Sequence, residues 1–128
     1  MENSRRLERE RVLELLYEAE IKNIPLDDLF ADLPTEPESF VRELVLGVSG
    51  EADSLDEEIK KRALNWDINR IAMLDRIILR IGIWELLHRP DTPVAVVISE
   101  AVELAKQFST QDSGKFINGI LGSMQDGR

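Results

Sequence analysis

The sequence predicts an all-α fold, a small bundle of six or seven helices. Apolar residues recur every three or four positions in each long segment, which is the spacing of an amphipathic helix. No stretch alternates apolar and polar residues as a half-buried strand would. With 128 residues and 43% apolar content, the chain is expected to form a single domain, 1–128, with one core.

The first two helices are expected before residue 34. From Asn3 to Lys22 the chain contains neither Gly nor Pro, and its apolar positions follow helical spacing. Pro25 then stands where a helix can start, so residues 25–33 are predicted to form a short second helix. This helix ends before the turn-like residues 34–37, which include two prolines.

One long helix of about seven turns is expected from Pro37 to Ala63. Its apolar positions step by three or four residues throughout. Gly47 and Gly50 lie inside this segment, and each costs about 1 kcal/mol relative to Ala. Because the apolar spacing is unbroken across both glycines, the helix is predicted to continue through them.

The second half of the chain predicts a central helix and two amphipathic ones. Residues 71–89 are apolar on almost every face, which places this helix in the middle of the bundle. Two prolines then break the chain, and amphipathic helices follow at residues 94–108 and around the last apolar run, from Phe116 to Met124. Asn118 and Gly119 in the last helix are interpreted as structural, with Gly119 giving room to a neighbouring helix and Asn118 capping or cross-linking it.

Composition excludes several classes of protein. There is no cysteine, so disulfides, thiolate zinc sites and cysteine nucleophiles are ruled out. No apolar run approaches the roughly 18 residues that a membrane helix needs, and the N-terminus carries charges where a secretory signal is apolar. The sequence therefore predicts a cytoplasmic protein that does not span a membrane.

The formal net charge of −9 argues against nonspecific binding of nucleic acid. This excess of acid is local. Residues 23–40 hold five acids and no base, between positions 27 and 38, and residues 51–58 hold five more acids. The two stretches are expected to be solvated helix surface and a loop, and the rest of the chain is close to neutral.

Nothing in the sequence favours catalysis or a metal site. His88 lies three residues after Glu85, the spacing of carboxylate-bridged di-iron bundles, but such a site needs two of these motifs and the chain has one histidine. Gly114-Lys115 lacks the upstream glycine and the following Ser or Thr of a phosphate-binding loop. Glu100 and Glu103 could be imagined as an acid/base pair but are interpreted as surface glutamates, and neither enzymatic activity nor a cofactor is expected.

Three arginines near the N-terminus stand apart from the acids of the same helix. At about 100° per residue, Arg5, Arg6 and Arg9 share an arc that overlaps the apolar stripe, whereas the glutamates 10, 14 and 18 fall on another face. The arginines are therefore predicted at the rim of the core. They could form a phosphate-contacting patch, or they could be surface residues that pair with Glu2 or Glu8.

Three segments carry a resemblance to a known family: RRLERERVLELLY at the start, LDRIILRIGIWELL in the middle and VISEAVELAKQFSTQDSGKFINGILGSM at the end. Together they closely resemble the NusB family of bacterial transcription antitermination factors, and the likeness covers nearly the whole chain. The resemblance implies an all-α, NusB-like bundle of about seven helices in two packed subdomains. The first, residues 1–64, would hold three helices, and the second, residues 65–128, the remaining four.

The resemblance also implies a function and partners. NusB-like proteins bind the single-stranded boxA element of leader and ribosomal RNA together with NusE, which is also a ribosomal small-subunit protein. The pair joins the RNA polymerase antitermination complex and suppresses premature termination. Family members differ in self-association, so a homodimer stays open.

Site residues are assigned by position within the resemblance. RNA contacts are implied for an N-terminal and a C-terminal segment, which comprise Arg5, Arg6 and Arg9, and Phe108, Asp112, Ser113, Lys115 and Phe116. On the central helix, contacts to NusE are implied for Asp75, Arg76 and Arg80. The RNA assignment agrees with the way single-stranded RNA is typically held, by cations on phosphates and by rings or hydrogen bonds on splayed bases.

Structural alternatives stay open for several of these residues. The rings of Phe108 and Phe116 share helical spacing with core positions and could belong to the core. Ser113 and Lys115 precede the last apolar stripe and are expected to face solvent. Arg76 and Arg80 could instead anchor the two subdomains through internal ion pairs.

The sequence departs from the family pattern at Leu7, where an additional arginine is common. Acids are interleaved with the arginines, so residues 1–11 sum to only +1, and RNA affinity without the partner is expected to be weak. The alternative function is a protein-interaction or dimerisation module of the same fold with weak or lost RNA binding. The acidic composition favours this alternative, and the retained arginines favour RNA binding.

Overall fold

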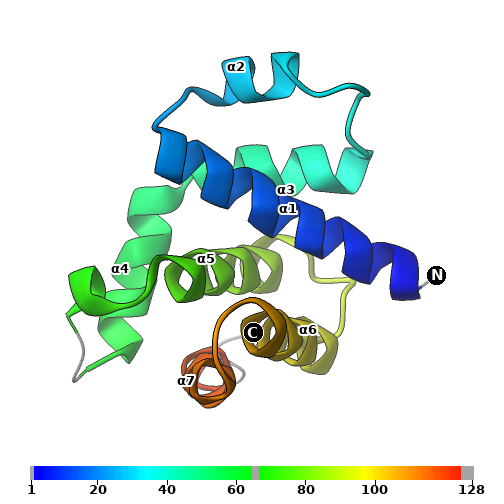
Figure 1. The fold of residues 1–128 in the computed structure, drawn as a ribbon. Coiled ribbons are helices and arrows are strands. Elements are labelled where there is room, and N and C mark those ends of the chain that lie inside the picture. Colours follow the sequence, from blue (N-terminus) through cyan, green and yellow to red (C-terminus); the bar gives the residue numbers. More distant parts are fainter. Residues whose placement is uncertain (1, 65–66, 125–128) are drawn as a thin grey trace.

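The computed structural model describes residues 2–64 and 67–124 of the chain. Within these ranges it contains α-helices and one short 3-10 helix (Figure 1), so the predicted all-α class is confirmed. The elements in chain order are α1 (Glu2–Lys22), α2 (Leu26–Ala31), α3 (Ser39–Gly50), α4 (Ala52–Arg62), η1 (Ile68–Arg70), α5 (Met73–His88), α6 (Val94–Phe108) and α7 (Gln111–Gly122).

Helix α5 is the centre of the bundle, as its apolar sequence predicts. It contacts α1, α3, α4, α6 and α7, and ten of its 16 residues are buried. Figure 1 shows α1 and α3 on one side of α5, α6 and α7 on the other, and α2 outermost beside α1 and α3. A helix enclosed in this way is apolar on most of its faces, because most of its surface lies against other helices.

The expected single helix from Pro37 to Ala63 is wrong, because the chain bends at Glu51. Helix α3 ends at Gly50, Glu51 has φ −117° and ψ 18°, and α4 begins at Ala52 in a new direction (Figure 1). At the bend the Glu51 carboxylate accepts a hydrogen bond from Trp84 Nε1 at 3.0 Å and lies 3.0 Å from His88 Nε2.

The bend is stabilised by packing that apolar periodicity does not reveal. Leu55 and Ile59 of α4 are 1% and 0% exposed, and α4 lies against α5. Residues 1–64 therefore hold four helices instead of the expected three. The division of the chain into subdomains 1–64 and 65–128 stays a prediction.

The close helix approaches occur at glycines other than the one predicted. Gly119 and Asn118 are exposed, and a methyl group at Gly119 would meet no other atom within 4 Å, so the structural role expected for this pair is wrong. A methyl group at Gly82 of α5 would instead lie 2.7 Å from Leu121 Cδ1 of α7. At Gly47 of α3, a methyl group would overlap the indole ring of Trp84.

Replacing Gly47 with Ala is expected to lower the free energy of unfolding by about 1–3 kcal/mol, the usual cost of overpacking a core. Gly50, which lies in the same helix with open space around it, is the matched control. Its replacement by Ala should leave stability unchanged or raise it by up to about 1 kcal/mol, because Ala favours the helix. Urea denaturation of the three proteins measures both changes, and equal stability of the two variants would contradict the packing of α3 on Trp84.

Candidate nucleic-acid interface

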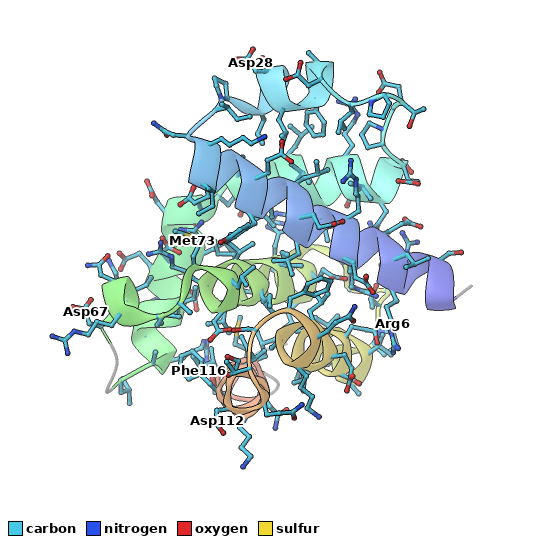
Figure 2. All side chains as sticks on the ribbon, in the orientation of Figure 1. Arg6, Asp28, Asp67, Met73, Asp112 and Phe116 are labelled. Carbon is cyan, nitrogen blue, oxygen red and sulfur yellow. The ribbon has the colours of Figure 1, made fainter. Side chains whose placement is uncertain are left out.

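The two segments expected to contact RNA lie on opposite sides of α6. Figure 2 shows Arg6 on one side of this helix, and Asp112 and Phe116 of α7 on the other. The structure therefore does not gather all the predicted contacts into one cluster. It forms two sites, one around the N-terminal arginines and one around the start of α7.

The N-terminal arginine cluster, defined as Arg5, Arg6 and Arg9, lies where α1 passes over the end of the core. Arg5 is half exposed, and its guanidinium lies 4.0 Å from the ring centroid of Phe40 in α3. It also pairs with Glu8 at 3.2 Å, which is the surface pairing left open by the sequence. The predicted position at the rim is thus confirmed for Arg5.

Arg6 is the most exposed member of the cluster and reaches across to α6. Its Nε and Nη2 donate to the two oxygens of Glu100 at 3.1 and 2.7 Å, a planar two-point contact. The Arg6 side chain is 51% exposed, whereas that of Glu100 is 13% exposed. The hydrogen bond and charge of Arg6 hold the pKa of Glu100 below its usual value, against the opposing effect of burial.

The predicted position at the rim is wrong for Arg9, which lies inside the protein with its side chain only 5% exposed. Its Nε and Nη2 each donate to an oxygen of Glu85 in α5 at 2.9 Å, and Glu85 is 2% exposed. Arg9 therefore ties α1 to α5. Because it is buried, Arg9 can affect RNA binding only through the residues that it holds in place.

A groove of about 520 Å³ runs between α1 and the first half of α6. We call it the α1–α6 groove. Its basic wall is the N-terminal arginine cluster, and the remaining residues that line it are Thr92, Ala95, Val96, Ser99 and Glu100. The groove is open to solvent along the exposed side of Arg6, so a phosphate could reach that guanidinium.

The second site is built at the start of α7, which Thr110 caps. The Thr110 hydroxyl accepts a hydrogen bond from the backbone N–H of Ser113 at 3.0 Å. Ser113 is buried, and its Oγ donates to Asp75 Oδ2 of α5 at 2.8 Å, so the expectation that it faces solvent is wrong. Lys115 is exposed, as expected.

The sequence left open whether the two aromatic residues of this segment belong to the core or contact RNA, and their burial is intermediate. Phe108 and Phe116 are partly buried and pack against the edge of the core. Each ring therefore contributes to packing and still presents a surface to solvent.

Phe116 borders a pocket of about 220 Å³ between the starts of α5 and α7, which we call the α5–α7 pocket. It is lined by Arg70, Ile71, Ala72, Asp75, Thr110, Asp112, Ser113 and Phe116. Asp75 is 8% exposed, and its Oδ1 has no hydrogen-bond partner in the part of the chain that the structure describes. A ligand that brings an N–H group into the pocket would satisfy this acceptor once the carboxylate turned toward it.

The three residues expected to contact NusE have different surroundings. Asp75 belongs to the α5–α7 pocket, beside predicted RNA contacts. Arg80 forms a two-point pair with Asp56 of α4 at 2.7 and 2.8 Å, which is the internal ion pair that the sequence left open. Arg76 is half-buried, and its Nη2 lies 3.6 Å from Met73 Sδ.

The charge of Arg80 is secure in this setting. Burial is the largest single influence on its pKa and lowers it, but the hydrogen bond and charge of Asp56, with smaller contributions from Glu20 and Asp53, raise the pKa above its ordinary value.

The sequence motifs considered for a metal site or a phosphate-binding loop have structural roles instead. Glu85 binds Arg9 and His88 lies against Glu51, so the two do not share a ligand, and no three His, Asp or Glu side chains among the described residues are placed to hold a metal ion. Lys115 lies inside α7 and not in a phosphate-binding loop. No helix in the described ranges is both long and apolar enough to cross a bilayer.

Sequence reasoning missed Glu85 and Glu100 as partners of the arginines, and Arg70 as a wall of the α5–α7 pocket. A signal for Glu85 was present, because an acid inside the apolar run from Ile81 to Leu87 needs a buried cation. Glu100 gave no such signal, since it looks like an ordinary surface glutamate.

Comparison with known proteins gives a consistent result. The model of the NusB family matches residues 6–126. A transcription antitermination protein NusB from Bacillus pumilus (strain SAFR-032) is 39% identical over 124 residues, which cover 95% of each chain. The solved structure of T. maritima NusB matches with a TM-score of 0.86 and 31% identity, covering 95% of this chain and 90% of that one.

A second similar structure contains RNA. One chain of the crystal structure of antitermination factors NusB and NusE in complex with double-stranded RNA matches with a TM-score of 0.84 over 100% of both chains. Its identity to this chain is 22%, so this match supports the fold alone.

Replacing Arg9 with Met is expected to cost about 3–5 kcal/mol of unfolding free energy, because it leaves the Glu85 carboxylate buried without a cation. The double variant Arg9→Met with Glu85→Leu should recover most of that loss. Urea denaturation gives the comparison, with Arg5→Met as the control at a half-exposed position. A loss that the second substitution does not reduce would show that packing of the Arg9 stem, and not the ion pair, carries the stability.

The pair between Arg6 and Glu100 should make stability depend on pH. The pKa of Glu100 is lowered from 4.5 in the folded protein, so its contribution is complete above that value and is lost as pH falls through the lowered pKa. Thermal melts of the wild type and of Glu100→Gln should therefore differ at pH 7, with the wild type higher, and converge in acid. A difference in Tm that does not change with pH would be inconsistent with this pair.

Proposed function

The chain belongs to the NusB family, and from this premise we propose that it is a transcription antitermination factor that binds boxA-type single-stranded RNA together with NusE. The complex would join RNA polymerase in the cytoplasm and act notably during transcription of ribosomal RNA. The role is one of binding, with no catalytic step.

The observation that carries the proposal is the α5–α7 pocket. It combines Asp75 Oδ1, a buried acceptor with no partner in ranges 2–64 and 67–124, with the partly exposed ring of Phe116 and the exposed cation Arg70 at its wall. A splayed base can stack on such a ring while its N–H groups reach the carboxylate, and a cation beside it can hold the adjoining phosphate. The pocket thus has the chemistry expected for an unstacked base.

The N-terminal arginine cluster would hold phosphates at the α1–α6 groove. Arg5 and Arg6 are the members with exposed guanidinium groups, and each already has a carboxylate partner. With Lys115 and Arg70 they make about four cations, for which single-strand counterion release gives a log-log salt slope near −3. Affinity without a partner is therefore expected to be modest.

The NusE contact is proposed on α5, at the surface around Arg76. Arg80 is committed to Asp56, and Asp75 faces the proposed base pocket, so Arg76 is the remaining candidate among the three residues. A partner at the start of α5 would lie next to the α5–α7 pocket and could share the RNA. In this placement NusE would raise the affinity for RNA by adding contacts beside the pocket.

A second candidate function is an interaction or dimerisation module that has lost useful RNA binding. The net charge of −9 and the carboxylate partners of all three N-terminal arginines favour it. It differs from the first proposal in one measurable respect, selective affinity for RNA.

Fluorescence anisotropy with labelled boxA-type RNA and a scrambled RNA, at two salt concentrations and with or without purified NusE, separates the two functions. Selective binding that tightens with NusE is expected. Equal binding of both RNAs, or none, in every condition would contradict the RNA proposal and leave the interaction module.

Replacing Phe116 with Ala tests the base pocket. The loss of a stacked base is worth about 1–3 kcal/mol, so selective affinity should fall roughly 5- to 160-fold. Phe30 of α2 is the matched control, because it is also partly buried at the edge of the core but lies on the far side of the bundle. A Phe30→Ala variant that loses as much RNA affinity would show that lowered stability, and not the pocket, explains the effect.

A further inference from the structure

The exposed guanidinium of Arg6 is occupied by a carboxylate of its own chain. Glu100 of α6 takes both forked donors, Nε and Nη2, at 3.1 and 2.7 Å. This is the same planar two-point contact that an arginine makes to a phosphate. A phosphate arriving in the α1–α6 groove must therefore compete with Glu100 for these donors.

Glu100 has a second cation within reach. Nη1 of Arg9 lies 3.9 Å from Glu100 Oε1, and Arg9 itself is held in place by Glu85. If Arg6 turns to another acceptor, Glu100 keeps a positive neighbour and is not left as an isolated, mostly buried charge. The cost of releasing Arg6 is thereby lowered.

The charges around the groove also balance. Arg6 and Arg9 face Glu85 and Glu100, so these four side chains carry no net charge. Arg5, the third arginine of the groove, is paired with Glu8, so every cation of the basic wall has a carboxylate partner. A groove whose arginines are all paired in this way attracts a polyanion only weakly at a distance. It can still bind one that makes good contacts elsewhere on the surface.

We propose that Glu100 is an internal competitor of RNA, which occupies Arg6 in the unbound protein and yields it to a phosphate when RNA binds. The inference rests on the proposed RNA-binding function and adds a residue that sets its affinity. When RNA binds, a phosphate replaces the Glu100 carboxylate as the partner of Arg6. The Glu100 side chain then moves toward Arg9. Glu100 thus lowers the affinity for any RNA that offers only a backbone, and binding then depends on the base contacts at α7.

The test is Glu100→Gln, which keeps the size and one acceptor oxygen of the side chain but removes its charge. Affinity for boxA-type RNA at low salt should rise about threefold to tenfold, since a charge-assisted pair no longer has to be broken. The log-log salt slope should become steeper by up to about 0.7, because Glu100 no longer requires a counterion when Arg6 turns to the phosphate. Affinity for scrambled RNA should rise by a similar factor, because both RNAs offer a phosphate to Arg6.

The matched control is Glu14→Gln. It removes one negative charge from an exposed side chain on the opposite face of α1, where Glu14 lies 4.0 Å from Arg11. Little change in RNA affinity is expected from it. Arg6→Ala, alone and combined with Glu100→Gln, shows whether the effect acts through Arg6, because the gain should largely vanish in the double variant.

The outcomes separate the two proposals. Wild type that binds boxA-type and scrambled RNA equally, or binds neither, overturns the RNA-binding function and this inference with it. Selective wild-type binding that Glu100→Gln leaves unchanged or weakens overturns the competitor role alone. A gain that persists without Arg6, or that Glu14→Gln matches, shows a general charge effect and also overturns it.

Discussion

The buried ion pair between Arg9 and Glu85 is the constraint on which the functional surface depends. Neither charge can be enclosed without the other, so α1 must cross α5 at the position where the two side chains meet. That crossing sets the rotation of α1 about its axis. It places Arg5 over Phe40 and Arg6 opposite Glu100, on the rim of the α1–α6 groove. The exposed cations are therefore positioned by a buried one.

Three charged residues of α5 fix the positions of the helices packed around it. Asp75 accepts from Ser113 of α7, Arg80 donates to Asp56 of α4, and Glu85 pairs with Arg9 of α1. Apolar contact alone would let these helices exchange or slide, because hydrophobic attraction has no direction. Hydrogen-bonded charges in a low-dielectric interior do have direction, and each of these three admits one partner at one height along the helix.

The sequence predicted the fold where structure is local and failed where distant residues decide it. Periodicity placed α1, α2, α5 and α6 correctly, but it could not show that Trp84 and His88 draw Glu51 into a bend, because those residues are more than thirty positions away. The same limit explains the site. One argument, a position before the last apolar stripe, predicted that Lys115 and Ser113 face solvent, and it holds only for Lys115. The burial of Ser113 and the pairing of Arg6 depend on acids of other helices, Asp75 and Glu100. Whether a glycine is needed for close helix packing also depends on residues distant in the sequence: Gly119 has open surroundings, whereas Gly47 lies against Trp84.

The Arg9–Glu85 pair also bears on how such a sequence can change over time. A lineage that loses the arginine first must carry a buried, uncompensated carboxylate until the glutamate is replaced too, and the reverse order strands a guanidinium. Either single step takes a large share of the few kcal/mol that keep a small domain folded. We therefore expect substitutions at these two positions to be coupled. Positions on the outer faces of the helices are expected to vary more freely, because a new charge or a new partner surface there does not disturb the interior.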